Sequence, residues 1–187
     1  MEFFAIYNIY RRVKLPISTR LKKVIGVTMF VGTMVSLIYF DFVVIQFSPW
    51  YNPRYFIPIA GMVIGNAMTG ITLGVSHLID GMKAKRDLVE SALMLGATPR
   101  QATKIMIDGA FDAAILPTIN SMVGMGIVFL PGMMTGVILS GIGPLVAIKY
   151  QIAIMLGITG SVALTVILFL HFGYQTFFNK KAQLEDL

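Results

Sequence analysis

The stretch GMKAKRDLVESALMLGATPRQATK, residues 81–104, is the longest polar interval in a strongly apolar sequence. Within it, Leu88, Ala92 and Leu95 recur at the i, i+4, i+7 spacing that places side chains on one face of a helix, and Val89 and Leu93 flank them. The lysine, arginine and acidic residues around them fall on other faces. The spacing therefore predicts a short amphipathic helix between two apolar stretches.

Three residues mark the end of this helix and the start of another. Gly96 is expected to end the first helix, because glycine readily takes the left-handed conformation at the position after the cap. Thr98 suits the N-cap of a following helix, and Pro99 suits its first position. Because apolar side chains on an exposed helix are unfavourable unless something covers them, we expect a partner protein to hold this corner in a groove. A solvated loop helix without a partner is the plainer alternative.

The composition is that of an integral membrane protein. Hydrophobic residues make up 56% of the chain, charged residues 13%, and the mean hydropathy is +0.78. Soluble domains carry roughly 25% charged residues. Long apolar runs favour helices over a barrel, so we predict an all-α, polytopic membrane protein with one domain over its 187 residues. The absence of cysteine excludes disulfides and thiolate metal sites.

The apolar runs predict about four full transmembrane helices and a partial one at the N-terminus. Residues 131–144, with a proline at each end and several glycines, are too few to cross a bilayer. We interpret them as a broken or re-entrant segment near the outer face, tolerable where protein buries it or a cavity adjoins it. The four expected spans are residues 24–47, 55–79, 111–130 and 148–171.

The distribution of positive charge predicts the orientation. With residues 81–104 facing the cytoplasm, all but Arg54 and Lys149 of the 15 Lys and Arg residues lie on the cytoplasmic side. This is the bias that the positive-inside rule describes, and it places both chain ends in the cytoplasm. Because the basic residues sit in short loops at span ends, the net charge of +6 argues for a membrane and against nucleic acid as the partner.

The second expected span carries small residues at helical spacing. Gly61 and Gly65 form one GxxxG pair, and Gly70 and Gly74 form another. Small residues four apart let another helix backbone come close in a membrane. We therefore expect these four glycines to be helix-packing positions.

A few polar or soft side chains inside the apolar segments are candidates for lining a translocation path. Asn66 and Asn120 lie within expected spans, and Met133, Met134 and Thr135 lie in the glycine-rich segment. Paired methionines are soft ligands for a transition metal, but methionine also serves as apolar filler. Both interpretations of the pair stay open.

No residue set predicts catalysis or a bound metal. The sequence has no GxxxxGK[ST] loop, so we expect no ATPase activity of its own, no enzyme active site and no cofactor bound by this chain. His77 and His171 both fall near inner ends of spans, where interfacial histidines are common. Asp41 is an acid within an expected span, where it is either functional or close enough to the outer surface to be solvated.

Glu90-Ser91-Ala92 followed by Gly96-Ala97 resembles the EAA…G motif of ABC transporter permeases. In those permeases the motif docks on the ATPase subunit. Three further blocks resemble the FetB-type permeases, whose bacterial members are described as probable iron exporters and whose plant relatives are involved in aluminium tolerance. These blocks are residues 57–68, 95–102 and 130–152.

This resemblance covers about residues 1–175 and implies a permease subunit of the inner (plasma) membrane. Family members are usually longer, and this chain begins inside what would be their third span. The resemblance implies two permease copies with two ATPase copies that hold the ATP and Mg²⁺, and export of a small solute, with iron or another metal ion as the candidate cargo. Expected ATPase contacts are Glu90, Ser91, Ala92, Gly96 and Ala97, followed by Thr98 and Pro99.

Two other functions are compatible with the sequence. A shortened permease could serve as a non-transporting membrane anchor or regulatory subunit. A secondary transporter would need intramembrane ionisable groups to couple an ion gradient, and Asp41 alone supports that weakly.

Overall fold

The computed structural model describes residues 1–13, 18–45, 53–128, 131–179 and 183–184. Every helix or strand element in these ranges is helical, and an isolated β-bridge joins Phe178 and Leu184. The expected all-α, polytopic membrane fold is confirmed. The elements are α1 (Glu2–Arg12), α2 (Thr19–Tyr39), the π-helix η1 (Phe40–Ile45), α3 (Pro53–Ala84), α4 (Arg86–Met94), α5 (Pro99–Ala102), α6 (Lys104–Gly124), α7 (Gly132–Leu139), α8 (Pro144–Gly173) and the 3-10 helix η2 (Tyr174–Phe177).

Three stretches of the described chain are long and apolar enough to cross a membrane: Thr19–Val44, Phe56–Ala84 and Pro144–Phe177. The other expected span, residues 111–130, corresponds to α6, which begins earlier and ends at Gly124. Asp108 and Asp112 lie in its first half, so α6 is less apolar than the three spans. Helix α6 thus ends six residues before the predicted end of that span.

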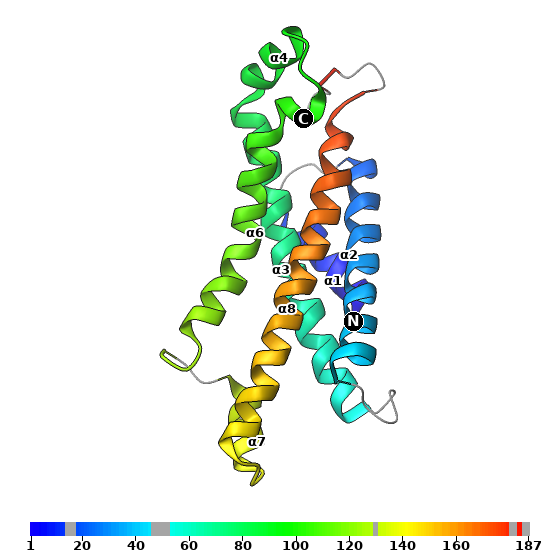
Figure 1. Ribbon diagram of the computed structural model, residues 1–187. Helices are drawn as coiled ribbons and strands as arrows, with labels where there is room; N and C mark the ends of the chain where they lie inside the picture. The colour runs from blue at the N-terminus through cyan, green and yellow to red at the C-terminus, as the bar shows by residue number, and fades with distance from the viewer. Residues whose placement is uncertain (14–17, 46–52, 129–130, 180–182, 185–187) are drawn as a thin grey trace.

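The four long helices lie side by side, with α4 at one end of the bundle and α7 at the other (Figure 1). Helix α8 contacts α2, α3 and α6, and the short α1 packs against α2 and α3. Fully buried side chains along these contacts include Met29, Ile71 and Val162. Outward side chains such as Phe30 are apolar as well, as a lipid-facing surface requires.

Glycines set the closest approach between helices. A Cβ added to Gly32 would lie 2.9 Å from the Cα atom of Thr165, so α2 and α8 pack backbone to backbone there. A Cβ on Gly70 would lie 2.8 Å from Val162 Cγ1, and one on Gly74 would lie 3.5 Å from Ala114 Cβ. Close packing of this kind is how membrane helices associate.

The two GxxxG pairs of α3 thus differ. Gly70 and Gly74 face α6 and α8, whereas a Cβ on Gly61 or Gly65 would have no neighbour within 4 Å among the described residues. The tight contact at Gly32 was not predicted, because a lone glycine in an apolar run has no motif around it. Spacing identifies a groove on a helix, but only the fold decides which groove is filled.

Candidate functional site

The corner between α4 and α5 forms as the sequence predicts. Gly96 adopts a φ of +89°, in the left-handed region that favours glycine. The Gly96 N–H donates to the carbonyl of Leu93 at 3.0 Å, and the Ala97 N–H donates to the carbonyl of Ala92 at 3.0 Å. This pair of bonds is the Schellman arrangement, which ends a helix while satisfying its last carbonyls.

Helix α5 begins with a capping box. The Gln101 N–H donates to Thr98 Oγ1, and the Thr98 N–H donates to Gln101 Oε1 at 2.9 Å, while Pro99 occupies the first helical position. Such reciprocal bonds satisfy two backbone donors that a helix start otherwise leaves free. The predicted second helix start is confirmed, and both sides of the corner are held by local hydrogen bonds.

Helix α4 packs through the flank of the expected apolar face, with Val89 in the core and Ala92 and Leu93 packed against it. Val89 is fully buried, whereas Leu88 is half exposed. Met94 and Leu95 are 87% and 89% exposed, so two large apolar side chains project at the corner. Buried Val89 anchors the helix, and the projecting pair is available for contact with another molecule.

The remaining motif residues are accessible to different degrees. Glu90 accepts a hydrogen bond from Arg86 Nε at 2.8 Å, an i,i+4 ion pair that supports the helix. Ser91 is exposed, and Ala92 and Ala97 are half buried. The corner therefore presents a short, locally stabilised helix with an apolar tip and a charged flank.

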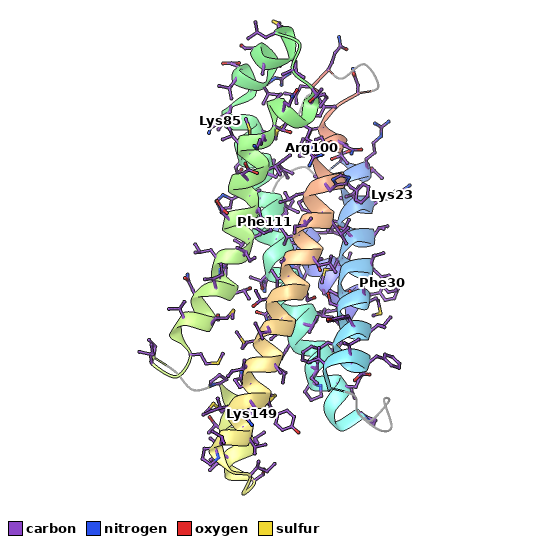
Figure 2. The ribbon with its side chains drawn as sticks, in the orientation of Figure 1. Lys23, Phe30, Lys85, Arg100, Phe111 and Lys149 are labelled. Carbon is purple, nitrogen blue, oxygen red and sulfur yellow. The ribbon has the colours of Figure 1, made fainter. Side chains whose placement is uncertain are left out.

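The corner lies at the end of the bundle where positive charge gathers. Lys85 and Arg100 are at this end, with Lys23 nearby, and Lys149 is at the opposite end (Figure 2). This separation is the pattern that the positive-inside rule describes for a cytoplasmic end.

The candidate path residues come from three helices and do not form one cluster. Asn66 in α3 donates from Nδ2 to the carbonyl of Met62 at 2.8 Å, and Thr135 in α7 donates to the carbonyl of Pro131 at 3.2 Å. Asn120 in α6 is exposed. Met133 and Met134 are half buried in α7, which packs against α8 at the end opposite α4. Within the described ranges, no hydrogen bond joins any two of these five residues.

One face of α3 is small and polar along its length. Gly61, Gly65, Thr69, Thr72 and Ser76 recur at helical spacing, and none of them is buried. The Thr69 hydroxyl donates to the Gly65 carbonyl at 3.2 Å, and the Thr72 hydroxyl donates to the Met68 carbonyl at 2.7 Å. This face holds no large apolar side chain for lipid. The spacing of glycine, threonine and serine residues in the sequence could have predicted this polar face, but the prediction used only the two glycine pairs.

The described residues hold no group of three His, Asp or Glu side chains placed to bind a metal ion. His77 lies on α3 and His171 on α8, where its ring meets Phe172 edge to face at 4.9 Å between centroids. Among the described residues, neither histidine belongs to such a group.

Two acidic side chains are buried among the described residues. Asp41 lies in η1 and is 7% exposed, and Glu2 in α1 is 8% exposed. Glu2 Oε1 is hydrogen-bonded to the Thr33 hydroxyl, and its Oε2 has no partner in the described part of the chain. Glu2 was not predicted as a buried polar residue, because residues 1–10 read as a fragment of an apolar span and the packing partner on α2 is 31 residues away.

A family model described as Uncharacterised protein family (UPF0014) matches residues 1–178. The chain belongs to this family. The match covers the α4–α5 corner, the polar face of α3 and the α7 segment, so each candidate feature of this UPF0014 member lies inside the family region.

Three relatives resemble the UPF0014 chain over most of its length, and one of them is named a probable iron export permease. It is 34% identical over 182 residues to the "Probable iron export permease protein FetB" of Escherichia coli (strain K12), which covers 97% of this chain and 68% of that protein. It is 40% identical over 164 residues to "Protein ALUMINUM SENSITIVE 3" of Arabidopsis thaliana, covering 88% of this chain and 59% of that protein. It is 38% identical over 165 residues to the "UPF0014 membrane protein STAR2" of Oryza sativa subsp. japonica, covering 88% and 57%.

The resemblance to FetB-type permeases is thereby confirmed, and the UPF0014 chain is a membrane protein of a permease family. It spans about three fifths of the length of the Arabidopsis and rice relatives. No solved structure matches it.

Proposed function

We propose that this chain acts as the membrane-spanning permease subunit of an ABC transporter, driven by a separate ATPase subunit. The supporting observation is the α4–α5 corner, where Met94 and Leu95 project from a helix end locked by a Schellman motif and a capping box. An exposed apolar tip of this kind suits a hydrophobic groove on a partner protein. ATP and Mg²⁺ bind to that partner, and this chain is not itself an enzyme.

The connectivity provides a way to transmit movement. Helix α4 follows α3 after a single residue, Lys85, and α5 leads into α6 through Thr103. Buried Val89 ties α4 to the hydrophobic core. A displacement of the corner by the ATPase would therefore move α3 and α6 together rather than bend a loose loop. Glu90, Ser91 and Ala97 would complete the contact, alongside the corner residues named above.

The path is proposed to run along the uncovered polar face of α3. Exposed Gly61 and half-buried Gly65, where an added Cβ would meet no described neighbour within 4 Å, leave room for another molecule, and Thr69 and Thr72 keep that face polar. Polar residues in membrane helices usually face a protein interior or a water-filled cavity rather than lipid. A second copy of the chain in a homodimer would enclose this face, with Asn66 at its edge and Asn120 on the neighbouring helix.

For the cargo, we propose a small solute of the metal-ion class, with iron as the first candidate because one relative is named a probable iron export permease. Met133 and Met134 in α7 would be soft ligands at the outer end. Substituting both by alanine should raise cellular iron content in a strain that depends on this protein, whereas Met155→Ala in the α8 core should not. Unchanged iron content in the double variant at equal expression would remove the methionine ligands from the proposal.

The docking proposal is tested with the chain co-expressed with an ABC ATPase from a FetB-type system. The wild-type chain should retain the ATPase on purification and change its rate of ATP hydrolysis. Met94→Ser with Leu95→Ser should lower retention at least about tenfold, since each buried large apolar side chain contributes about 1.5–3 kcal/mol. Leu139→Ser is the matched control, because the Leu139 side chain is 82% exposed at the opposite end of the bundle.

Two outcomes separate the alternatives. If the ATPase binds but its turnover never changes, the chain is better described as an anchor or regulatory subunit. If the Met94 and Leu95 variants retain the ATPase as well as the Leu139 variant does, the corner is not the docking element.

A further inference from the structure

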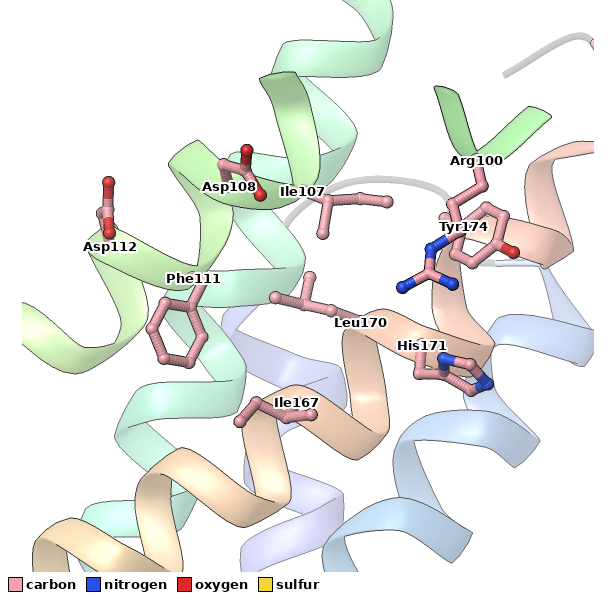
Figure 3. A pocket seen from close by; sticks show the side chains of 9 residues that line it. All are labelled: Arg100, Ile107, Asp108, Phe111, Asp112, Ile167, Leu170, His171 and Tyr174. Atoms are coloured by element: carbon pink, nitrogen blue, oxygen red, sulfur yellow. The ribbon is translucent and has the colours of Figure 1, made fainter. Parts of the chain in front are cut away.

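A cavity of about 430 Å³ lies between α5, α6 and the end of α8, separate from the projecting corner (Figure 3). Arg100 extends from α5 into the cavity lining, and His171 and Tyr174 line the cavity on the same side as Arg100. Asp108 and Asp112 lie across from them on α6, with Phe111, Ile167 and Leu170 between the two sides. The cavity thus has a cationic edge, an acidic edge and an apolar floor.

The charged side chains at the two edges of the cavity do not form ion pairs with one another. Arg100 forms no hydrogen bond or ion pair with any described residue, and the same holds for the side chains of Asp108 and Asp112. All three are exposed. Because Asp108 and Asp112 are four residues apart on one helix, their carboxylates share a face and can both reach one ligand.

Arg100 lies at the end of the bundle that carries Lys85 and Lys23, and Phe111, which also lines the cavity, lies further along the bundle toward the opposite end (Figure 2). Phe111 and Ile167 belong to α6 and α8 and lead from the cavity along the bundle. A ligand with a charged head and an apolar tail would place its head at the cytoplasmic boundary and its tail against these helices.

We propose that this cavity binds a phospholipid whose headgroup carries both a phosphate and a primary ammonium, the phosphatidylethanolamine class. The Arg100 guanidinium binds the phosphate, since arginine presents a planar set of donors that matches phosphate oxygens. Asp108 and Asp112 accept hydrogen bonds from the ammonium, and the acyl chains pack on Phe111 and Ile167.

The lining selects among headgroups on simple chemical grounds. A quaternary ammonium has no N–H to donate, so phosphatidylcholine leaves the two carboxylates without hydrogen bonds. The phosphatidylglycerol headgroup has a phosphate but no ammonium. It therefore brings negative charge near Asp108 and Asp112 and supplies no positive group to pair with their carboxylates. Free phosphate or soluble phosphoethanolamine would gain nothing from the apolar floor.

The test uses the purified full chain in detergent and measures lipid binding by native mass spectrometry and by equilibrium titration. The expected order of affinity is phosphatidylethanolamine first, with phosphatidylcholine and phosphatidylglycerol weaker, and soluble phosphoethanolamine weakest. This order is measured on the unmodified chain, so it decides the proposal even if a variant does not fold. Preferential binding of phosphatidylglycerol, or equal binding of all three lipids, would overturn it.

Variants then test which edge of the cavity binds the phosphate and which binds the ammonium. Arg100→Gln should lower the affinity for both phosphatidylethanolamine and phosphatidylcholine at least about tenfold, because a charge-assisted hydrogen bond to phosphate is lost. Asp108→Asn with Asp112→Asn should abolish the preference for phosphatidylethanolamine over phosphatidylcholine while phosphate binding persists. Lys104→Gln and Asp80→Asn, exposed charges outside the cavity, are the controls, and losses as large in these would refute the site.

Discussion

At the scale of single residues, the close contact between Gly32 and Thr165 leaves no room for a side chain at position 32. We predict that Gly32→Ala lowers stability by about 1–3 kcal/mol, because the new methyl group meets backbone that cannot rotate away. Gly65→Ala, on the uncovered face of the same bundle, should be neutral or slightly stabilising, since alanine is the better helix former and no described atom lies within 4 Å. The measurement is the thermal midpoint of both variants in one detergent.

The same pair of variants separates packing from function. If Gly65 lines the proposed path or faces a second copy, Gly65→Ala should change transport or dimerisation without lowering the thermal midpoint. If Gly32→Ala proves as stable as the wild-type chain, the close approach of α2 and α8 is wrong.

At the scale of elements, the α4–α5 corner depends on the backbone at Gly96. A β-branched residue is strained at a φ of +89°, so Gly96→Val should reorient the corner and uncouple ATP hydrolysis from transport while the long helices stay folded. ATP turnover and cargo export are measured together in vesicles. Gly141→Val imposes the same backbone strain, also at a φ of +89°, beyond α7, and it should leave ATPase binding intact. Normal coupling in the Gly96 variant would show that the corner geometry is dispensable.

At the scale of the whole molecule, the orientation in the membrane decides whether a cytoplasmic partner can reach α4. The chain contains no cysteine, so single cysteines can be introduced at exposed Ser91 and Ser140, which lie near opposite ends of the bundle. An impermeant thiol reagent added to intact cells should label Ser140→Cys and spare Ser91→Cys until the cells are opened. Labelling of Ser91→Cys in intact cells would place the corner outside and end the transporter proposal.

The local features were predictable because neighbouring residues produce them. The left-handed turn at Gly96 and the cap at Thr98 were predicted and are present, since each rests on hydrogen bonds between residues within five positions of one another. The projecting side chains were less predictable. Helical spacing gave an apolar face of Leu88, Ala92 and Leu95 flanked by Val89 and Leu93. Helix α4 buries Val89 and leaves Leu88 and Leu95 exposed, because its neighbours in space set which side of the helix is covered.

The amino-acid sequence alone therefore determined the membrane class, the all-helical fold and the corner, because hydropathy and capping act along a continuous stretch of chain. Only the tertiary structure decided which glycines bring helices together, that Glu2 meets Thr33, and that Arg100 and His171 lie across one cavity from Asp108 and Asp112. These pairings join separate helices, and in a protein apolar on nearly every face, spacing does not show which faces meet.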